Sequence, residues 1–114
     1  MNNKQIIQLR LDNLLNYNKN MYVSTIILNR IIFLDKLFNF IKSIDNSKRI
    51  DVNTINTTIK FIIDNYKIDK YYLKNIIIVK QLLILGSIDL VYKKFIDCLN
   101  LVYYNFVWFY LFEL

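Results

Sequence analysis

Residues 54–66, TINTTIKFIIDNY, carry the clearest structural signal in the chain. Five isoleucine and tyrosine side chains in this stretch recur at the spacing of one helical face, and they are Ile55, Ile59, Ile62, Ile63 and Tyr66. The residues between them are mostly polar. We therefore predict an amphipathic helix here, with Asp51 or Asn53 as its N-cap.

The same helical period continues outward from this stretch in both directions. It predicts further helices at about residues 4–17, 22–44, 70–85 and 88–114. The polar strings 16–20 (NYNKN) and 45–51 (DNSKRID) are expected to separate the first three helices. Gly86, the only glycine, favours a left-handed stop between the last two, followed by Ser87 as an N-cap. The β-branched run 76–79, IIIV, fits a strand as well as a helix.

These elements predict an all-α protein of about five helices, forming a small irregular helical bundle with an aromatic-rich C-terminal helix. A chain of 114 residues is expected to form a single helical domain over residues 1–114. The helix at 22–44 has only a narrow polar stripe, so most of its surface should be covered.

The chain is more apolar than a typical domain. Its hydrophobic fraction is 55%, with 16% aromatic residues, against roughly 45–50% apolar residues in soluble domains. One reading is that surplus apolar surface faces a partner protein or lipid. The alternative is mutational drift in an AT-rich genome, which exchanges small core residues for larger ones.

The C-terminal segment 88–114 is expected to dock on a membrane or a partner. Residues 98–112, CLNLVYYNFVWFYLF, include no charge, but as a helix they cover roughly 22 Å of a hydrocarbon core about 30 Å thick. A membrane span, an interfacial or subunit-packed helix and an ordinary core helix all fit this segment. We predict partner or membrane contacts at Val102, Phe106, Trp108, Phe109 and Phe112. Core packing against the second and fourth helices is the alternative for the same side chains.

The residue types argue against catalysis. There is no histidine, so Cys98, the only cysteine, has no imidazole partner. A single glycine cannot build a P-loop or a dinucleotide-binding turn, and the aspartates lack the spacing of a calcium loop. We expect a non-enzyme with no catalytic, cofactor-binding or metal site. Residues 1–13 also lack the long apolar region of a secretory signal.

The basic residues do not indicate nucleic-acid binding. The net charge is +6, but twelve of the fifteen basic residues are lysine and only three are arginine. Arginine is the residue that supplies bidentate phosphate contacts. The only adjacent basic pairs are Lys48–Arg49 and Lys93–Lys94. A nucleic-acid partner is therefore not expected.

Alanine, proline and histidine are absent, while isoleucine, leucine, asparagine, lysine, tyrosine and phenylalanine dominate. This composition resembles lineage-specific proteins encoded by the AT-rich mitochondrial genomes of ciliates and related protists. The resemblance transfers no functional residue. It implies a non-catalytic structural or scaffold subunit of a multi-subunit complex of the mitochondrial inner membrane, such as ATP synthase or a respiratory complex. The alternatives are an organellar ribosomal RNA-binding protein and a viral helical protein-interaction module in the host cytoplasm.

Overall fold

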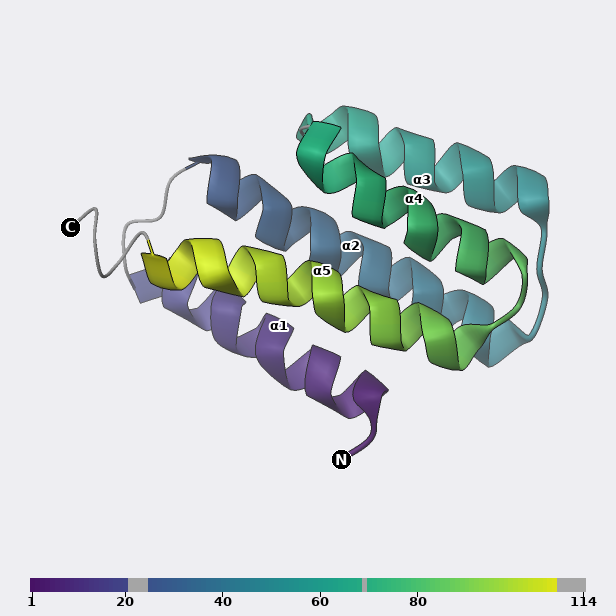
Figure 1. Cartoon of the computed structure of the whole chain (residues 1–114), viewed down its shortest axis with the longest axis horizontal. Coiled ribbons are helices and arrows are strands. Elements are labelled where there is room, and N and C mark those ends of the chain that lie inside the picture. The colour runs from purple at the N-terminus through teal and green to yellow at the C-terminus, as the bar shows by residue number, and fades with distance from the viewer. Residues whose placement is uncertain (21–24, 69, 109–114) are drawn as a thin grey trace.

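The chain folds into α-helices joined by short connections (Figure 1). The computed structural model describes residues 1–20, 25–68 and 70–108, with the backbone alone at 17–20, 71 and 103–108. The described residues form five helices and no strand: α1 (Asn3–Asn20), α2 (Thr25–Ser47), α3 (Val52–Tyr66), α4 (Lys70–Ile84) and α5 (Ile88–Trp108). The all-α prediction is confirmed, and the ambiguous run 76–79 is helical within α4.

Two predicted breaks are wrong in position. Helix α1 continues through the polar string 16–20, and α2 continues to Ser47. Each asparagine costs a helix less than about 1 kcal/mol, and α1 as a whole packs against α2 and α5. At the end of α2, Tyr92 and Lys48 bind the Asp45 side chain, which favours helix where the sequence suggested a loop.

Side-chain caps mark the start of two helices. Asp51 is the N-cap of α3, and its Oδ1 accepts hydrogen bonds from the backbone N–H groups of Asn53 (3.0 Å) and Thr54 (3.3 Å). The bonds from Thr54 and Asn53 stabilise the charged form and lower the pKa of Asp51. Before α1, Asn2 and Gln5 bond reciprocally through side chain and backbone at 3.0 and 2.9 Å, as in a capping box.

Gly86 ends α4 as the sequence predicts. Its φ is +77°, in the left-handed region that favours glycine. The Gly86 N–H donates to the Leu83 carbonyl at 3.0 Å, and the Ser87 N–H donates to the Leu82 carbonyl at 3.1 Å. This pair of bonds is the Schellman motif. Ser87 then occupies the N-cap position of α5, and its carbonyl accepts from Val91 at 2.9 Å.

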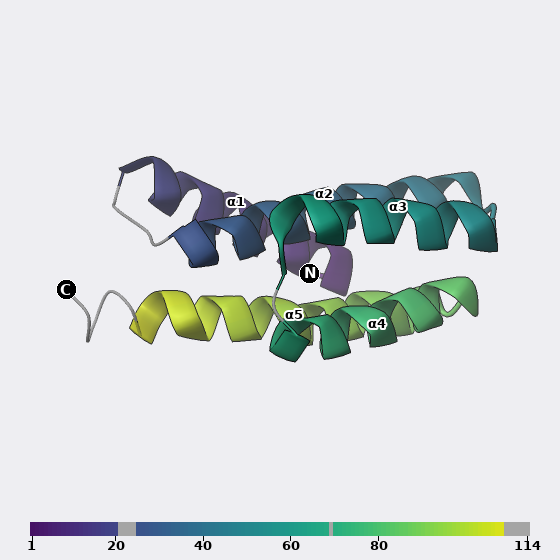
Figure 2. The same ribbon diagram turned by 90° about the horizontal axis from the view of Figure 1, so that it is seen from above.

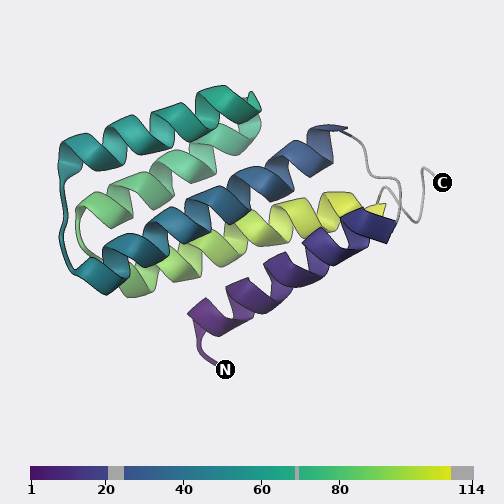
Figure 3. The same cartoon turned by 180° about the vertical axis from the view of Figure 1, so that it is seen from behind.

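Consecutive helices run in opposite directions, and four of them close into a ring (Figures 1 and 3). Contacts join α2 to α3, α3 to α4, α4 to α5, and α5 back to α2. Figure 2 shows this ring as two layers, with α2 and α3 above α4 and α5. Helix α1 packs outside the ring against α2 and α5. The architecture is therefore an up-and-down four-helix bundle with one added helix.

The core lies inside this ring and under α1. Helix α2 contacts α1, α3 and α5. The narrow polar stripe of α2 predicts that most of its surface is covered, and these three helices cover it. The Phe38 ring lies 5.5 Å from that of Phe95 and 6.2 Å from that of Tyr92, while Phe33 and Tyr72 meet edge to face at 6.5 Å. Such aromatic pairs add to the free energy gained from burial alone.

Candidate functional site

The predicted contact segment begins inside the core. Val102 is completely buried in the bundle together with Cys98 and Leu99. Of the two predictions made for this residue, partner contact and core packing, the structure shows core packing. Phe106 and Trp108 belong to α5, where the structure describes their backbone alone. Phe109 and Phe112 lie outside the described residues. The contact role of these four aromatic residues stays a prediction.

A continuous stripe of α5 explains why Val102 is buried. The buried positions of this helix follow the spacing of one helical face, and they are Val91, Tyr92, Phe95, Cys98, Leu99 and Val102. The α5 stripe packs against α1, α2 and α4. The uncharged segment that starts at Cys98 therefore contributes Cys98, Leu99 and Val102 to the core, while Asn100 is exposed.

Cys98 is a buried apolar side chain, with a thiol that burial keeps neutral. Its removal from water raises the pKa of the thiol to about 12. The thiolate is the reactive form of cysteine, so Cys98 is poorly suited to nucleophilic chemistry. Its backbone carbonyl accepts a hydrogen bond from the Tyr72 hydroxyl at 3.1 Å, which links α4 to α5.

The carboxylate of Asp45 is the centre of a polar cluster that the sequence did not predict. The Tyr92 hydroxyl donates to Asp45 Oδ2 at 2.9 Å, and Lys48 Nζ donates to Oδ1 at 3.0 Å. Lys4 Nζ lies 3.9 Å from Oδ2. The bond from Lys48 is the main cause that lowers the pKa of Asp45. The pKa of Tyr92, in contrast, is raised by burial and by the bond to Asp45. The cluster joins α1, α2 and α5.

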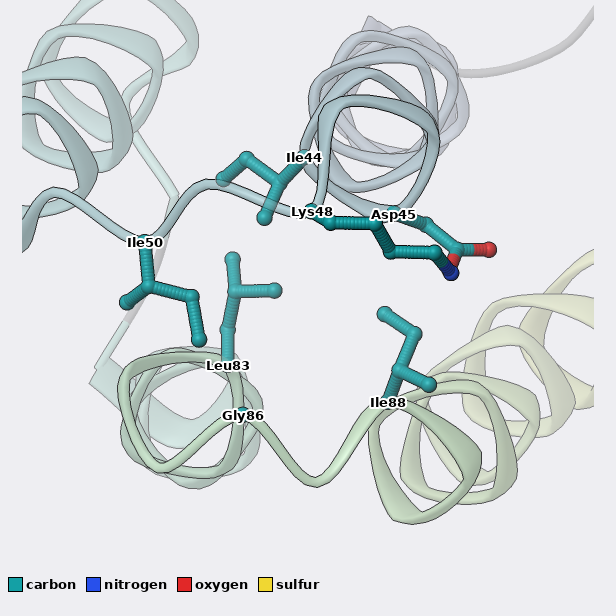
Figure 4. A pocket seen from close by; sticks show the side chains of 7 residues that line it. All are labelled: Ile44, Asp45, Lys48, Ile50, Leu83, Gly86 and Ile88. Carbon is teal, nitrogen blue, oxygen red and sulfur yellow. The ribbon is translucent and has the colours of Figure 1, made fainter.

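Beside this cluster, a slot of about 190 Å³ opens between the α2–α3 connection and the α4–α5 turn. Figure 4 shows Ile44 and Ile50 on one side, with Leu83 and Ile88 pointing towards them from α4 and α5. Gly86 lies on the lower side, and Asp45 and Lys48 stand at the rim. We call this feature the isoleucine slot. It is smaller than typical ligand pockets of about 300–1,000 Å³.

A second pocket of the same volume, about 190 Å³, has a different lining. It lies between the start of α2 and the end of α3 and is lined by Ile26, Asn29, Arg30, Tyr66, Lys67 and Ile68. Two of these side chains are cationic, and Arg30 also lies over the Tyr72 ring at 5.6 Å. We call it the cationic pocket.

In residues 1–20, 25–68 and 70–108, no three side chains of ligating type gather as a metal site would require. Across those ranges, no helix combines the length and the apolarity needed to cross a bilayer.

Comparison with known proteins finds no match among protein-family models, curated proteins or solved structures.

Proposed function

We propose that this chain is a non-catalytic structural subunit of a multi-subunit complex at the mitochondrial inner membrane, of the ATP synthase or respiratory type. Its contact with a partner or with the membrane is formed by the C-terminal part of α5 and the residues after it. Phe106, Trp108, Phe109 and Phe112 are the contact residues.

The continuation of the α5 backbone past Val102 to Trp108 is the observation that carries this proposal. Val102 is packed in the bundle, and the helix backbone runs on to Trp108. Residues 103–112, YYNFVWFYLF, include no charge. Aromatic side chains dominate the binding free energy of many interfaces, and tryptophan and tyrosine favour the membrane–water boundary. The helix is thus anchored in the fold at Val102, and residues 103–112 have the composition of a contact surface.

The apolar surplus of the chain also supports a subunit role. Large hydrophobic side chains are exposed on the described surface, among them Leu85, Leu90 and Val52. Single exposed hydrophobics are common on monomers. The support comes from their combination with the uncharged C-terminal segment.

The first test is fractionation of the native source. We expect the protein to co-migrate with an inner-membrane complex on a blue-native gel, with mass spectrometry naming the other chains. The association should survive high salt, because apolar contacts are not screened, whereas phosphate contacts weaken steeply with salt. Sedimentation with ribosomal RNA, or a free soluble pool, would contradict the proposal.

A paired variant locates the contact. Trp108→Ser combined with Phe109→Ser should release the protein from the complex and leave the helical circular-dichroism signal in place. Phe61→Ser, an exposed aromatic on α3, is the control and should leave the association intact. Loss of the helical signal in the double variant would instead assign these two side chains to the core.

A further inference from the structure

We propose that the cationic pocket binds the phosphate group of an anionic phospholipid at the membrane surface. This inference rests on the proposed function and deepens it, because it names the lipid group that the subunit meets near its C-terminal segment. The pocket lies between the start of α2 and the end of α3.

The lining of the cationic pocket has the charge that a phosphate requires. Arg30 and Lys67 each contribute a positive charge, and none of the described lining residues is acidic. Asn29 and Tyr66 add an amide and a hydroxyl as uncharged donors. The phosphate of a phospholipid offers oxygen acceptors and a negative charge, so these four side chains match it in both respects.

Arg30 is a cation that the fold holds in place. Its side chain is half-buried, and its guanidinium lies over the Tyr72 ring at 5.6 Å. Tyr72 is itself buried, and its hydroxyl donates to the Cys98 carbonyl at 3.1 Å. A guanidinium carries five N–H donors, so it can bind a phosphate alongside other partners. The pocket is therefore partly preorganised, which lowers the entropic cost of binding.

The volume of the pocket suits a single phosphate group. It is about 190 Å³, and an engineered cavity of about 150 Å³ holds benzene, which is larger than a phosphate group by one heavy atom. Pockets that enclose a whole small molecule measure about 300–1,000 Å³. The ligand is therefore expected to insert its charged group and to keep its other atoms outside, as a lipid in a bilayer does.

The pocket lies towards the same end of the bundle as the predicted membrane contact. The start of α2 and the described end of α5 are both at this end (Figures 1 and 3). Residues 103–108 of the uncharged aromatic segment continue α5 there. Ile26, on the pocket lining, is 66% exposed. Protein surfaces that lie on membranes combine cations with exposed apolar and aromatic side chains. This position favours a lipid phosphate over the carboxylate of a partner protein.

Lys67 and Lys48 form a matched pair for the test. Both are exposed lysines with a left-handed backbone, at φ of 49° and 57°. Lys67 lines the cationic pocket, whereas Lys48 follows the end of α2, away from its start. Lys67→Gln and Lys48→Gln each remove one positive charge from an exposed position. Circular dichroism should show the same helical content in both variants.

The first arm of the experiment uses inorganic phosphate and the full chain at constant ionic strength. We expect phosphate to shift the backbone amide NMR signals of Asn29 and Ile68 in a saturable manner. Lys67→Gln should weaken this binding about tenfold, because a bond to a charged group is lost, and Lys48→Gln should leave it unchanged. The site would be overturned by the absence of a saturable shift, by an equal loss in both variants, or by acetate binding as tightly as phosphate.

A further variant examines the charge balance of the pocket. Asp69 follows the lining residue Ile68 in sequence and lies outside the described residues. Asp69→Asn removes its charge. If phosphate binds to Asp69→Asn but not to the wild type, the pocket of the natural chain is neutralised and the proposal fails.

The second arm assigns the phosphate to a lipid. Vesicles of pure phosphatidylcholine are compared in a flotation gradient with vesicles that also contain phosphatidylglycerol. The wild type should bind the anionic vesicles more strongly, Lys67→Gln should lose most of this preference, and Lys48→Gln should keep it. An equal loss in both variants would assign the preference to diffuse surface charge. Phosphate binding without any lipid preference would assign the pocket to a soluble phosphate. Either result overturns the lipid inference.

Co-migration with the native complex separates this inference from the proposed function. If the wild type co-migrates with an inner-membrane complex but shows no preference for anionic vesicles, the lipid inference fails and the proposed function stands. If the wild type binds phosphate and anionic vesicles as expected but associates with no complex, the lipid site stands and the proposed function fails.

Discussion

Helices α2 and α3 are neighbours in sequence and in space, yet they contribute very differently to the core. Helix α3 has the cleaner amphipathic pattern, but it buries only Ile55, Ile59 and Ile62 and packs against α2 and α4. Helix α2 has a blurred pattern, buries seven side chains and packs against three helices. Of these two neighbours, the helix with the sharp apolar stripe has fewer helix contacts, and the helix with the wide apolar surface has more.

The largest effect is expected for Phe38→Ala in α2. The Phe38 ring is 0% exposed and contacts the rings of Tyr92 and Phe95. Its removal should lower the free energy of unfolding by about 3–5 kcal/mol through lost burial and the cavity left behind. Urea denaturation followed by circular dichroism measures this loss. A decrease below about 1 kcal/mol would remove α2 from its central role.

A smaller loss is expected for Gly86→Ala, which disturbs the connection between α2 and α3 through Ile50. Alanine at this position would keep a φ of +77°, and its Cβ would lie 3.0 Å from Ile50 Cδ1. The left-handed conformation alone costs a residue with a side chain roughly 1–2 kcal/mol. Thermal unfolding should show the decrease. The neighbouring change Leu85→Ala is the control, and an equal decrease there would show that the glycine conformation is not the cause.

Asp45→Asn should weaken the polar link between the end of α2 and α5, with an effect that depends on pH. The fold lowers the pKa of Asp45 from its ordinary 3.8, chiefly through the bond from Lys48. The unfolded chain therefore takes up this proton first as the pH falls. The stabilisation is complete above pH 3.8 and is lost as the pH falls through the folded-state pKa.

Denaturation of wild type and Asp45→Asn across the pH range tests this link. The wild type should be the more stable of the two at pH 7, and the difference should shrink in acid. Tyr92→Phe removes the other bond to Asp45 and should cost about 1 kcal/mol at pH 7. A difference between wild type and Asp45→Asn that does not change with pH would show that charge is not involved.

The smallest effect is expected for Phe61→Ala in α3. The Phe61 side chain is 64% exposed, so its truncation should change the free energy of unfolding by no more than about 0.5 kcal/mol. The same denaturation experiment used for Phe38→Ala gives a direct comparison of one residue type at two places. A loss as large as that of Phe38→Ala would mean that Phe61 is covered in solution, as by a second copy of the chain.

The helices themselves could be predicted because their signals are local. The 3.6-residue period identified all five, the left-handed stop at Gly86 was predicted from the only glycine, and Asp51 was one of two N-cap candidates. Helix ends were less predictable. Asparagine in 16–20 and the charged residues of 45–51 favour turns in isolation, but α1 continues to Asn20 and α2 to Ser47. At the end of α2, the bond from Tyr92 to Asp45 joins this helix to α5.

The candidate contact site was likewise predicted only in part. The uncharged segment 98–112 is visible in the sequence, and its aromatic residues suggested a contact. The sequence did not reveal that Cys98, Leu99 and Val102 in its first part belong to the core. The isoleucine slot was not predicted either. Its four walls are separated by up to 44 residues from Ile44 to Ile88, and isoleucine is so common in this chain that composition offers no signal.

The sequence by itself determined the number and the approximate positions of the helices, because helical periodicity, capping and the conformational freedom of glycine act within a few residues. Only the tertiary structure decided that α2 is central, that α1 packs outside a closed ring, and that Asp45 joins three helices. Amphipathic helices of similar length can pack in several orders with similar apolar burial. The order is set by the fit of particular side chains, such as Phe38 against Tyr92 and Phe95, and that fit exists only between segments far apart in the chain.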